Sequence, residues 1–195
     1  VQMCSLKPGA TISQYNKMLD GFFAWSEENN FNVTFMRQSP LFTHSNASHP
    51  SQYDFVEFIA AAHSVQGASW DKWLSTKEGQ KLNARWNELA TCHVKMANMI
   101  MQYANVDAMN SDSDRVVTWN WCTRKDGVSW DQLQAKHQSI AANVTSETPN
   151  IGWGTLFPHI GGANTPGEFA HVVIYPDVAG LMQASANFAN GGWRG

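Results

Sequence analysis

The sequence predicts an α+β protein made of two copies of one unit, each with the element order βαββαβ. The first observation behind this prediction is a repeated motif, because residues 4–9 read CSLKPG and residues 122–127 read CTRKDG. A pattern typical of a helix start follows both motifs. The second observation is alternation of apolar and polar residues, as at Phe31, Val33 and Phe35, which is the period of a half-buried strand.

Two shorter pairs of matching segments follow the motif, in the same order in both halves of the chain. PLFTH at 40–44 matches TLFPH at 155–159, and HPSQY at 49–53 matches TPGEF at 165–169. Their offsets differ slightly from that of the motif, which short length changes in the connecting loops explain. Because these signals share one order, we interpret the chain as an internal duplication.

The first repeat is predicted to span residues 1–104. Strands are expected where apolar and polar residues alternate, and helices where apolar residues recur every three or four positions behind a capping Ser. The expected elements are a strand at 1–6, a helix capped by Ser13 and ending near 29, strands at 31–44 and 53–63, a helical stretch capped by Ser69 and broken near Gly79, and a strand at 92–104. Met and Ala in the last segment leave a helix as the alternative there.

A polar, acidic linker is predicted at 105–114, and a second repeat at 115–195. The expected elements of this repeat are a strand at 115–125, a helix capped by Ser129 and ending near 144, strands at 151–162 and 167–176, and a helix at 177–190. The last part of the second helix and the fourth strand have no counterpart. We therefore expect an open sheet edge, unless another element covers it or the natural protein is longer.

The cysteines fit this arrangement. A βαββαβ unit folds as a ferredoxin-like sheet, in which the first and fourth strands are antiparallel neighbours. Cys4 lies near the end of the first strand and Cys92 at the start of the fourth, so a Cys4–Cys92 disulfide is predicted. Cys122 holds the Cys4 position in the second repeat and is expected to be free. The disulfide indicates a periplasmic or secreted protein, whereas three buried thiols would indicate a cytoplasmic one.

Composition excludes several classes of function. A net charge of −3 and a pI near 6.1 argue against a nucleic-acid binder. No apolar run approaches the roughly 18 residues of a membrane span. There is no Cys-x-x-Cys, His-Glu-x-x-His or P-loop motif, so no metal site is predicted. Nine Trp and ten Phe fit core packing, and they also fit walls around an apolar ligand.

Two ferredoxin-like units in one chain resemble the dimeric α+β barrel superfamily, here as a fused pseudodimer. The resemblance covers nearly all of the chain in element order and involves no catalytic motif. It implies a barrel formed by the facing sheets of two units, a pocket between sheet and helices, and a pseudodimer that could self-associate. Members include small monooxygenases, haem-degrading enzymes, haem peroxidase-like proteins and stress-induced proteins, so the resemblance does not assign a function.

Four histidines are candidates for such a pocket. His44 and His159 are the last residues of the matching segments PLFTH and TLFPH. They would contact a ligand, act in acid–base chemistry or simply cap strand ends. His63 is expected to end a strand and His171 to lie within one, each in one repeat only. Either would serve as a structural residue, a general base or an axial haem ligand.

Three further residues complete the candidate set. Arg37 shares the parity of an apolar strand face, so it would point towards a pocket and meet a carboxylate. Glu57 lies on an apolar face, where burial would make it a base. Trp121 alternates with Cys122 and would pack in the core or stack on a substrate. Surface pairing is the alternative for Arg37 and Glu57.

Two functions follow from these expectations, and the sequence does not decide between catalysis and binding. In the first, the protein binds a small apolar or aromatic ligand in a pocket without turning it over. In the second, it is a monooxygenase-like or haem-using enzyme that acts on an aromatic or lipid-like small molecule. No cofactor is assigned by the sequence, although haem is compatible with the second function.

Overall fold

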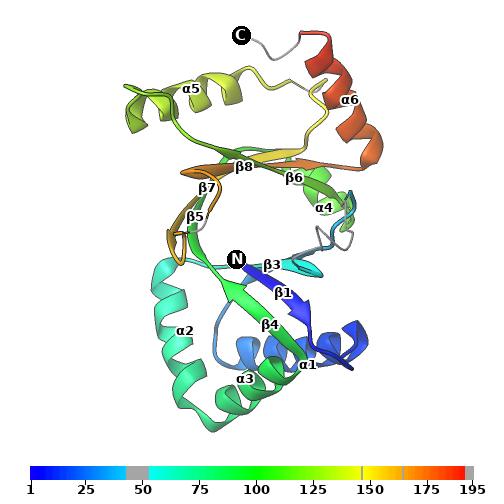
Figure 1. Ribbon diagram of the computed structural model, residues 1–195, viewed down its shortest axis with the longest axis vertical. Coiled ribbons are helices and arrows are strands. Elements are labelled where there is room, and N and C mark those ends of the chain that lie inside the picture. Colours follow the sequence, from blue (N-terminus) through cyan, green and yellow to red (C-terminus); the bar gives the residue numbers. More distant parts are fainter. Residues whose placement is uncertain (43–52, 146, 164, 192–195) are drawn as a thin grey trace. The chain divides into compact units, whose positions relative to one another are not determined.

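The structure is a computed structural model that describes residues 1–42, 53–145, 147–163 and 165–191. It divides the chain into two compact units, Val1–Lys95 and Met96–Gly195 (Figure 1). Each unit is α+β and contains one four-stranded antiparallel sheet. The predicted repeats, 1–104 and 115–195 with a linker between them, are units of sequence. This division into compact units does not test them, so they stay a prediction.

The sheet of the first unit has the strand order β2-β3-β1-β4, with antiparallel neighbours throughout. Its elements are β1 (Gln2–Leu6), α1 (Ile12–Glu28), β2 (Thr34–Gln38), β3 (Phe55–Ala60), α2 (His63–Ser75), α3 (Lys77–Leu89) and β4 (Ala90–Val94). The three helices cover one face of this sheet (Figure 1).

The core of the first unit lies between these helices and the sheet. Phe22 of α1 packs edge-on against Trp73 of α2 and Trp86 of α3, with ring centroids 5.6 Å apart in both pairs. Most of the abundant aromatic residues of this unit are therefore packing residues. The predicted break near Gly79 is confirmed and falls at Thr76, so Gly79 itself lies in the first turn of α3. A side chain at Gly79 would collide with the backbone carbonyl of Trp73.

The helix starts differ in part from the prediction. Thr11, and not Ser13, is the N-cap of α1, and its hydroxyl accepts a hydrogen bond from the Gln14 backbone in a capping box. Likewise α2 begins at His63, six residues before the predicted cap Ser69. The predicted Ser129 cap of the later helix is confirmed, again with a capping box.

The predicted fourth strand at 92–104 is wrong as a single element, because two strands meet there. β4 ends at Val94 and pairs with β1, whereas β5 (Met96–Ala104) belongs to the second sheet. Cys92 lies directly opposite Cys4 in the β1–β4 register, and the two sulfur atoms are at disulfide-bond distance, as predicted.

The sheet of the second unit has the order β5-β7-β8-β6. After β5, its elements are α4 (Val106–Ser111), β6 (Val116–Cys122), α5 (Trp130–Ala142), β7 (Gly152–Ile160), β8 (Phe169–Tyr175) and α6 (Val178–Ala189). The helix α4 thus lies inside the segment predicted as a linker. Helices α5 and α6 both lie over one face of this sheet (Figure 1).

β5 pairs with β7 at one edge of the second sheet, and β6 forms the other edge. No strand in the described part of the chain pairs with the outer side of β6. The predicted open edge is therefore present among the described residues. No helix in the described ranges has the length and apolar character needed to cross a membrane.

The repeated motif forms the same local structure twice. After β1 and after β6 the chain turns through a glycine with positive φ, 84° at Gly9 and 79° at Gly127, a conformation that favours glycine. A capping box then starts α1 and α5. The motif therefore encodes a strand end, a tight turn and a helix start.

Candidate functional site

A buried carboxylate lies on the helix-covered face of the first sheet. Glu57 of β3 is fully buried, and both of its oxygens have partners. Oε2 accepts hydrogen bonds from Gln2 Nε2 at 2.7 Å and from the Tyr15 hydroxyl at 2.9 Å. Oε1 accepts one from Arg37 Nε at 2.9 Å. These bonds join β1, α1, β2 and β3 around one side chain.

Arg37 is the carboxylate's counter-ion, and it lies directly opposite Glu57 in the β2–β3 register. Its NH1 donates to Asn16 Oδ1 at 2.6 Å, and its guanidinium lies 5.0 Å from the centre of the Phe55 ring. Burial, with the nearby Glu57 charge, raises the pKa of Tyr15, so its hydroxyl remains a donor. This ion-pair cluster can stabilise the fold, but both Glu57 oxygens already accept hydrogen bonds, so neither is available to accept a proton from a substrate.

A histidine pair lies on the corresponding face of the second sheet. His171 of β8 and His137 of α5 have ring centroids 5.0 Å apart in an edge-to-face arrangement. Trp153 of β7 donates from Nε1 to His171 Nδ1 at 3.0 Å. Because Nδ1 accepts this bond, it carries no proton, and neutral His171 has its proton on Nε2.

Both imidazoles of this pair are neutral at neutral pH. Burial, together with the nearby His137, lowers the pKa of His171 to about 4. Burial also lowers the pKa of His137. No carboxylate of the described residues counteracts either shift.

His137 is the distinctive residue of this cluster. Its side chain is only 2% exposed, and its Nδ1 has no hydrogen-bond partner in the described part of the chain. Around it lie the rings of Trp153 at 5.4 Å and Phe169 at 6.0 Å, measured between centroids. Most buried polar atoms have a partner, so an unpaired nitrogen among aromatic rings requires an explanation.

The strand registers show that the two clusters occupy equivalent places. The equivalent cross-strand pairs are Cys4–Phe55 in the first unit and Cys122–Phe169 in the second. Two residues further along β3 and β8 lie Glu57 and His171. The sequence therefore has a carboxylate in one unit where it has an imidazole in the other.

The residue opposite this position on the neighbouring strand also differs, being charged in the first unit and neutral in the second. Arg37 lies opposite Glu57, whereas Thr155 lies opposite His171. Thr155 is fully buried, and its hydroxyl accepts a hydrogen bond from Gln102 Nε2 at 2.9 Å. The second unit thus has neutral groups at the positions where the first unit has an ion pair.

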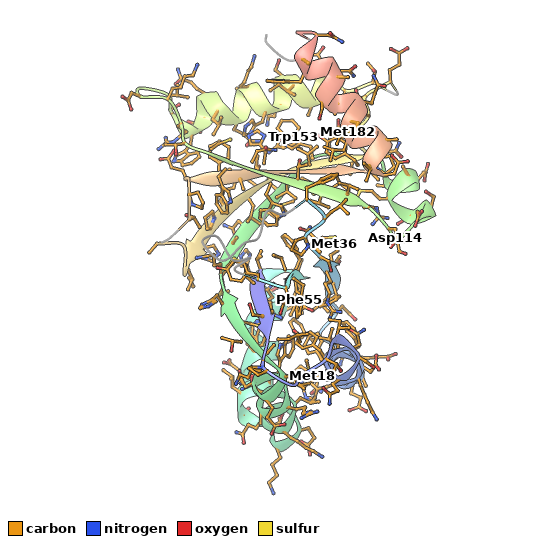
Figure 2. All side chains as sticks on the ribbon, turned by 45° about the vertical axis from the view of Figure 1, so that its right-hand side comes forward. Met18, Met36, Phe55, Asp114, Trp153 and Met182 are labelled. Carbon is orange, nitrogen blue, oxygen red and sulfur yellow. A yellow bond between two sulfur atoms is a disulfide. The ribbon has the colours of Figure 1, made fainter. Side chains whose placement is uncertain are left out.

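The helix α6, over the same face of the second sheet (Figure 1), leaves apolar surface uncovered. None of its residues is buried, and Val178, Met182 and Phe188 are 40%, 49% and 57% exposed. Trp153 and Met182 both lie on the side of the sheet that carries the helices (Figure 2). An amphipathic helix normally buries its apolar stripe on the sheet beneath it, which α6 does not do.

The other predicted site residues lie elsewhere. His63 is the first residue of α2 and does not end a strand, because β3 stops at Ala60. His159 is an exposed residue near the end of β7. Trp121 stacks with Trp119 on the sheet face opposite His171. His44 lies outside the described residues.

Sequence reasoning missed His137. A signal was present, because Leu133, His137 and Ile140 recur at helical spacing and share one face of the helix. Among the described residues, no group of three His, Cys, Asp or Glu side chains could hold a metal ion.

No protein-family model, no curated protein and no solved structure matches the chain.

Proposed function

We propose that this protein binds a small, largely apolar or aromatic ligand beside His137, on the helix-covered face of the second sheet, without transforming it. The observation that carries the proposal is the buried, unpartnered His137 Nδ1. An unpaired polar atom in apolar surroundings costs about 1–3 kcal/mol, and a ligand group that pairs with it recovers that cost. A neutral imidazole nitrogen pairs with a hydroxyl or a carbonyl, according to its tautomer.

The surroundings of His137 support an apolar ligand body. Trp153 and Phe169 provide aromatic walls beside His137, and α6, over the same sheet face (Figure 1), exposes Met182 and Phe188. Aromatic walls with a single polar contact are characteristic of small-molecule sites.

Binding is favoured over catalysis because the ionisable groups are poorly suited to proton transfer. His171 Nδ1 already accepts a hydrogen bond, and the pKa of His171, about 4, is far from neutrality. Glu57 is fully paired. The alternative, a haem-using or monooxygenase-like enzyme, is supported by one observation, the two adjacent neutral imidazoles, since a neutral imidazole can ligate haem iron. Absorbance near 400 nm after addition of haemin, lost in His137→Phe and His171→Phe, would favour it.

A matched pair of probes tests the binding proposal. 2-Naphthol and naphthalene differ only in the hydroxyl that would pair with His137. We expect equilibrium dialysis to show that the wild-type protein prefers 2-naphthol by about fivefold to tenfold, the value of one hydrogen bond of about 1 kcal/mol. His137→Phe should bind the two probes equally. A preference that persists in this variant, or equal binding by the wild type, contradicts the proposal.

We also propose that both units are ferredoxin-like repeats, as the resemblance to the dimeric α+β barrel superfamily implies. The order β2-β3-β1 in the first sheet corresponds to β7-β8-β6 in the second, which supports a duplication. The barrel and any self-association stay predictions of that resemblance. The Cys4–Cys92 pair supports a periplasmic or secreted location.

A further inference from the structure

The outer edge of β6 is a candidate binding surface for another strand. β6 pairs with β8 over seven residues, Val116 to Cys122, and no described strand covers its other side. An uncovered edge presents backbone N–H and C=O groups that can pair with an added strand. Cys122, at the end of this strand, is a half-buried free thiol.

The first unit shows which strand fits an edge of this kind. β1 is the counterpart of β6, because both end in the repeated motif and both place a Cys opposite a Phe of the neighbouring strand. The edge of β1 away from β3 is covered by β4, which runs antiparallel to it. Cys92 of β4 lies opposite Cys4 and is bonded to it.

The residues of β4 define the chemistry of such a strand. Ala90 and Val94, two positions to either side of Cys92, lie on the same face as the disulfide. Ala90 is buried at 2% exposure. The pattern is therefore a small residue, a cysteine and a β-branched residue at alternate positions of an antiparallel strand.

We propose that the outer edge of β6 binds a cysteine-bearing strand of a partner polypeptide, antiparallel, with the partner's cysteine opposite Cys122 and a disulfide between them. On the other face of β6 the added strand would lie beside Trp121, which favours β-branched or aromatic neighbours there. A second copy of this chain does not fit this edge by pairing its own β6 with β6. Cys122 is the last residue of β6, so a two-fold pairing centred on it would lose most of the strand overlap.

The covalent step is a thiol–disulfide exchange and needs no separate oxidant. The Cys122 thiolate attacks the cysteine sulfur of a partner strand that carries a mixed disulfide with glutathione. The new S–S bond forms, the old one breaks, and glutathione leaves as the thiolate with the electron pair. The Cys122 proton goes to solvent. Burial raises the pKa of Cys122, so the exchange should be faster at mildly alkaline pH.

Two synthetic peptides test the register. The first is ELATCHVK, the sequence of residues 88–95, and the second is ELACTHVK, in which the Thr and Cys are exchanged. The exchange keeps the composition but moves the cysteine to the opposite face of the strand. Each peptide carries 2-nitro-5-thiobenzoate on its cysteine, and release of this coloured thiolate gives the rate. The rate with free glutathione corrects for intrinsic reactivity.

We expect the full chain to react about tenfold faster with ELATCHVK than with ELACTHVK after this correction, because only the first places its sulfur opposite Cys122. Peptide mapping should locate the adduct at Cys122, and Cys122→Ser should form none. Equal corrected rates for the two peptides would overturn the proposal. Labelling that persists in Cys122→Ser would overturn it as well, because the reaction would then lie at Cys4 or Cys92.

Discussion

Trp153 Nε1 donates a hydrogen bond to His171 Nδ1 at 3.0 Å, and the two rings lie nearly parallel with their centroids 5.4 Å apart. The indole N–H therefore fixes the tautomer of the imidazole, and the indole lies beside that ring, close to its plane. This relationship makes His171 a neutral acceptor, whereas Nδ1 of the nearby His137 has no hydrogen-bond partner among the described residues.

The depressed pKa of His171 predicts a specific pH dependence. The folded-state pKa of about 4 is below the ordinary value of 6.5, so the unfolded chain binds the proton more readily. The contribution to stability is fully present above pH 6.5 and is lost as the pH falls towards 4. After allowance for partial exposure, we expect a loss on the order of 1–2 kcal/mol.

Urea unfolding between pH 7 and pH 4 measures this loss. His171→Phe should show a smaller pH dependence than the wild type, whereas His159→Gln, at an exposed position of β7, should follow the wild type. A His171 ring proton that titrates near pH 6.5 by NMR would refute the prediction directly.

Replacement of His137 should distinguish a binding residue from a packing residue. His137→Phe removes the unpaired nitrogen and retains a ring of similar shape, so stability without ligand should stay equal or rise by up to about 1 kcal/mol. His137→Ala leaves a cavity and should cost about 2–4 kcal/mol. Thermal and urea unfolding of both variants gives these values. A large loss in His137→Phe would mean that Nδ1 has a partner in solution.

Removing Arg37 alone should destabilise the fold more than removing Arg37 and Glu57 together. Arg37→Met leaves the fully buried Glu57 carboxylate without its counter-ion and should cost about 3–5 kcal/mol of unfolding free energy. The double variant Arg37→Met/Glu57→Leu removes both charges and should recover a large part of that loss. Urea unfolding of Arg37→Met, Glu57→Leu and the double variant completes a double-mutant cycle. Additive losses would argue against direct coupling.

The Cys4–Cys92 disulfide should stabilise the first unit substantially. Its two cysteines are 88 residues apart in sequence, so the closed loop is long. We expect Cys92→Ser to lower the unfolding free energy by about 3–4 kcal/mol under non-reducing conditions. Cys122→Ser is the matched control and should change stability little. In denatured mass spectra, a gain of about 2 Da on reduction should occur in the wild type and disappear in Cys92→Ser.

The elements near the repeated motif could be predicted because their signals are local. Positive-φ glycines and capping residues act within a few positions, so the turns at Gly9 and Gly127 followed from the sequence. The Cys4–Cys92 proximity followed from antiparallel neighbours. The split at Lys95 did not, because β4 and β5 form one continuous extended segment, and pairing with two different sheets is a tertiary property.

The candidate site was predicted in part. Strand parity placed Arg37 and Glu57 each on the apolar face of its own strand, and the structure pairs them with each other. Parity could not show that hydrogen bonds from Gln2, Tyr15 and Arg37 would occupy both oxygens of Glu57. His137 was missed because a helix residue becomes part of a sheet site only through packing. His63 was misplaced because the apolar run FVEFIAAAH does not show where the strand stops and α2 begins.

The most direct test of the account is histidine-selective ¹⁵N NMR of the intact chain, with and without 2-naphthol. The proposal predicts a change in the His137 Nδ1 resonance on addition of 2-naphthol, no such change with naphthalene, and an unchanged His159 signal. The Nδ1 resonance of His171 should report the Trp153 hydrogen bond in all samples. If 2-naphthol leaves His137 Nδ1 unchanged, or shifts His159 instead, the ligand does not bind where the structure indicates, and the central proposal is wrong.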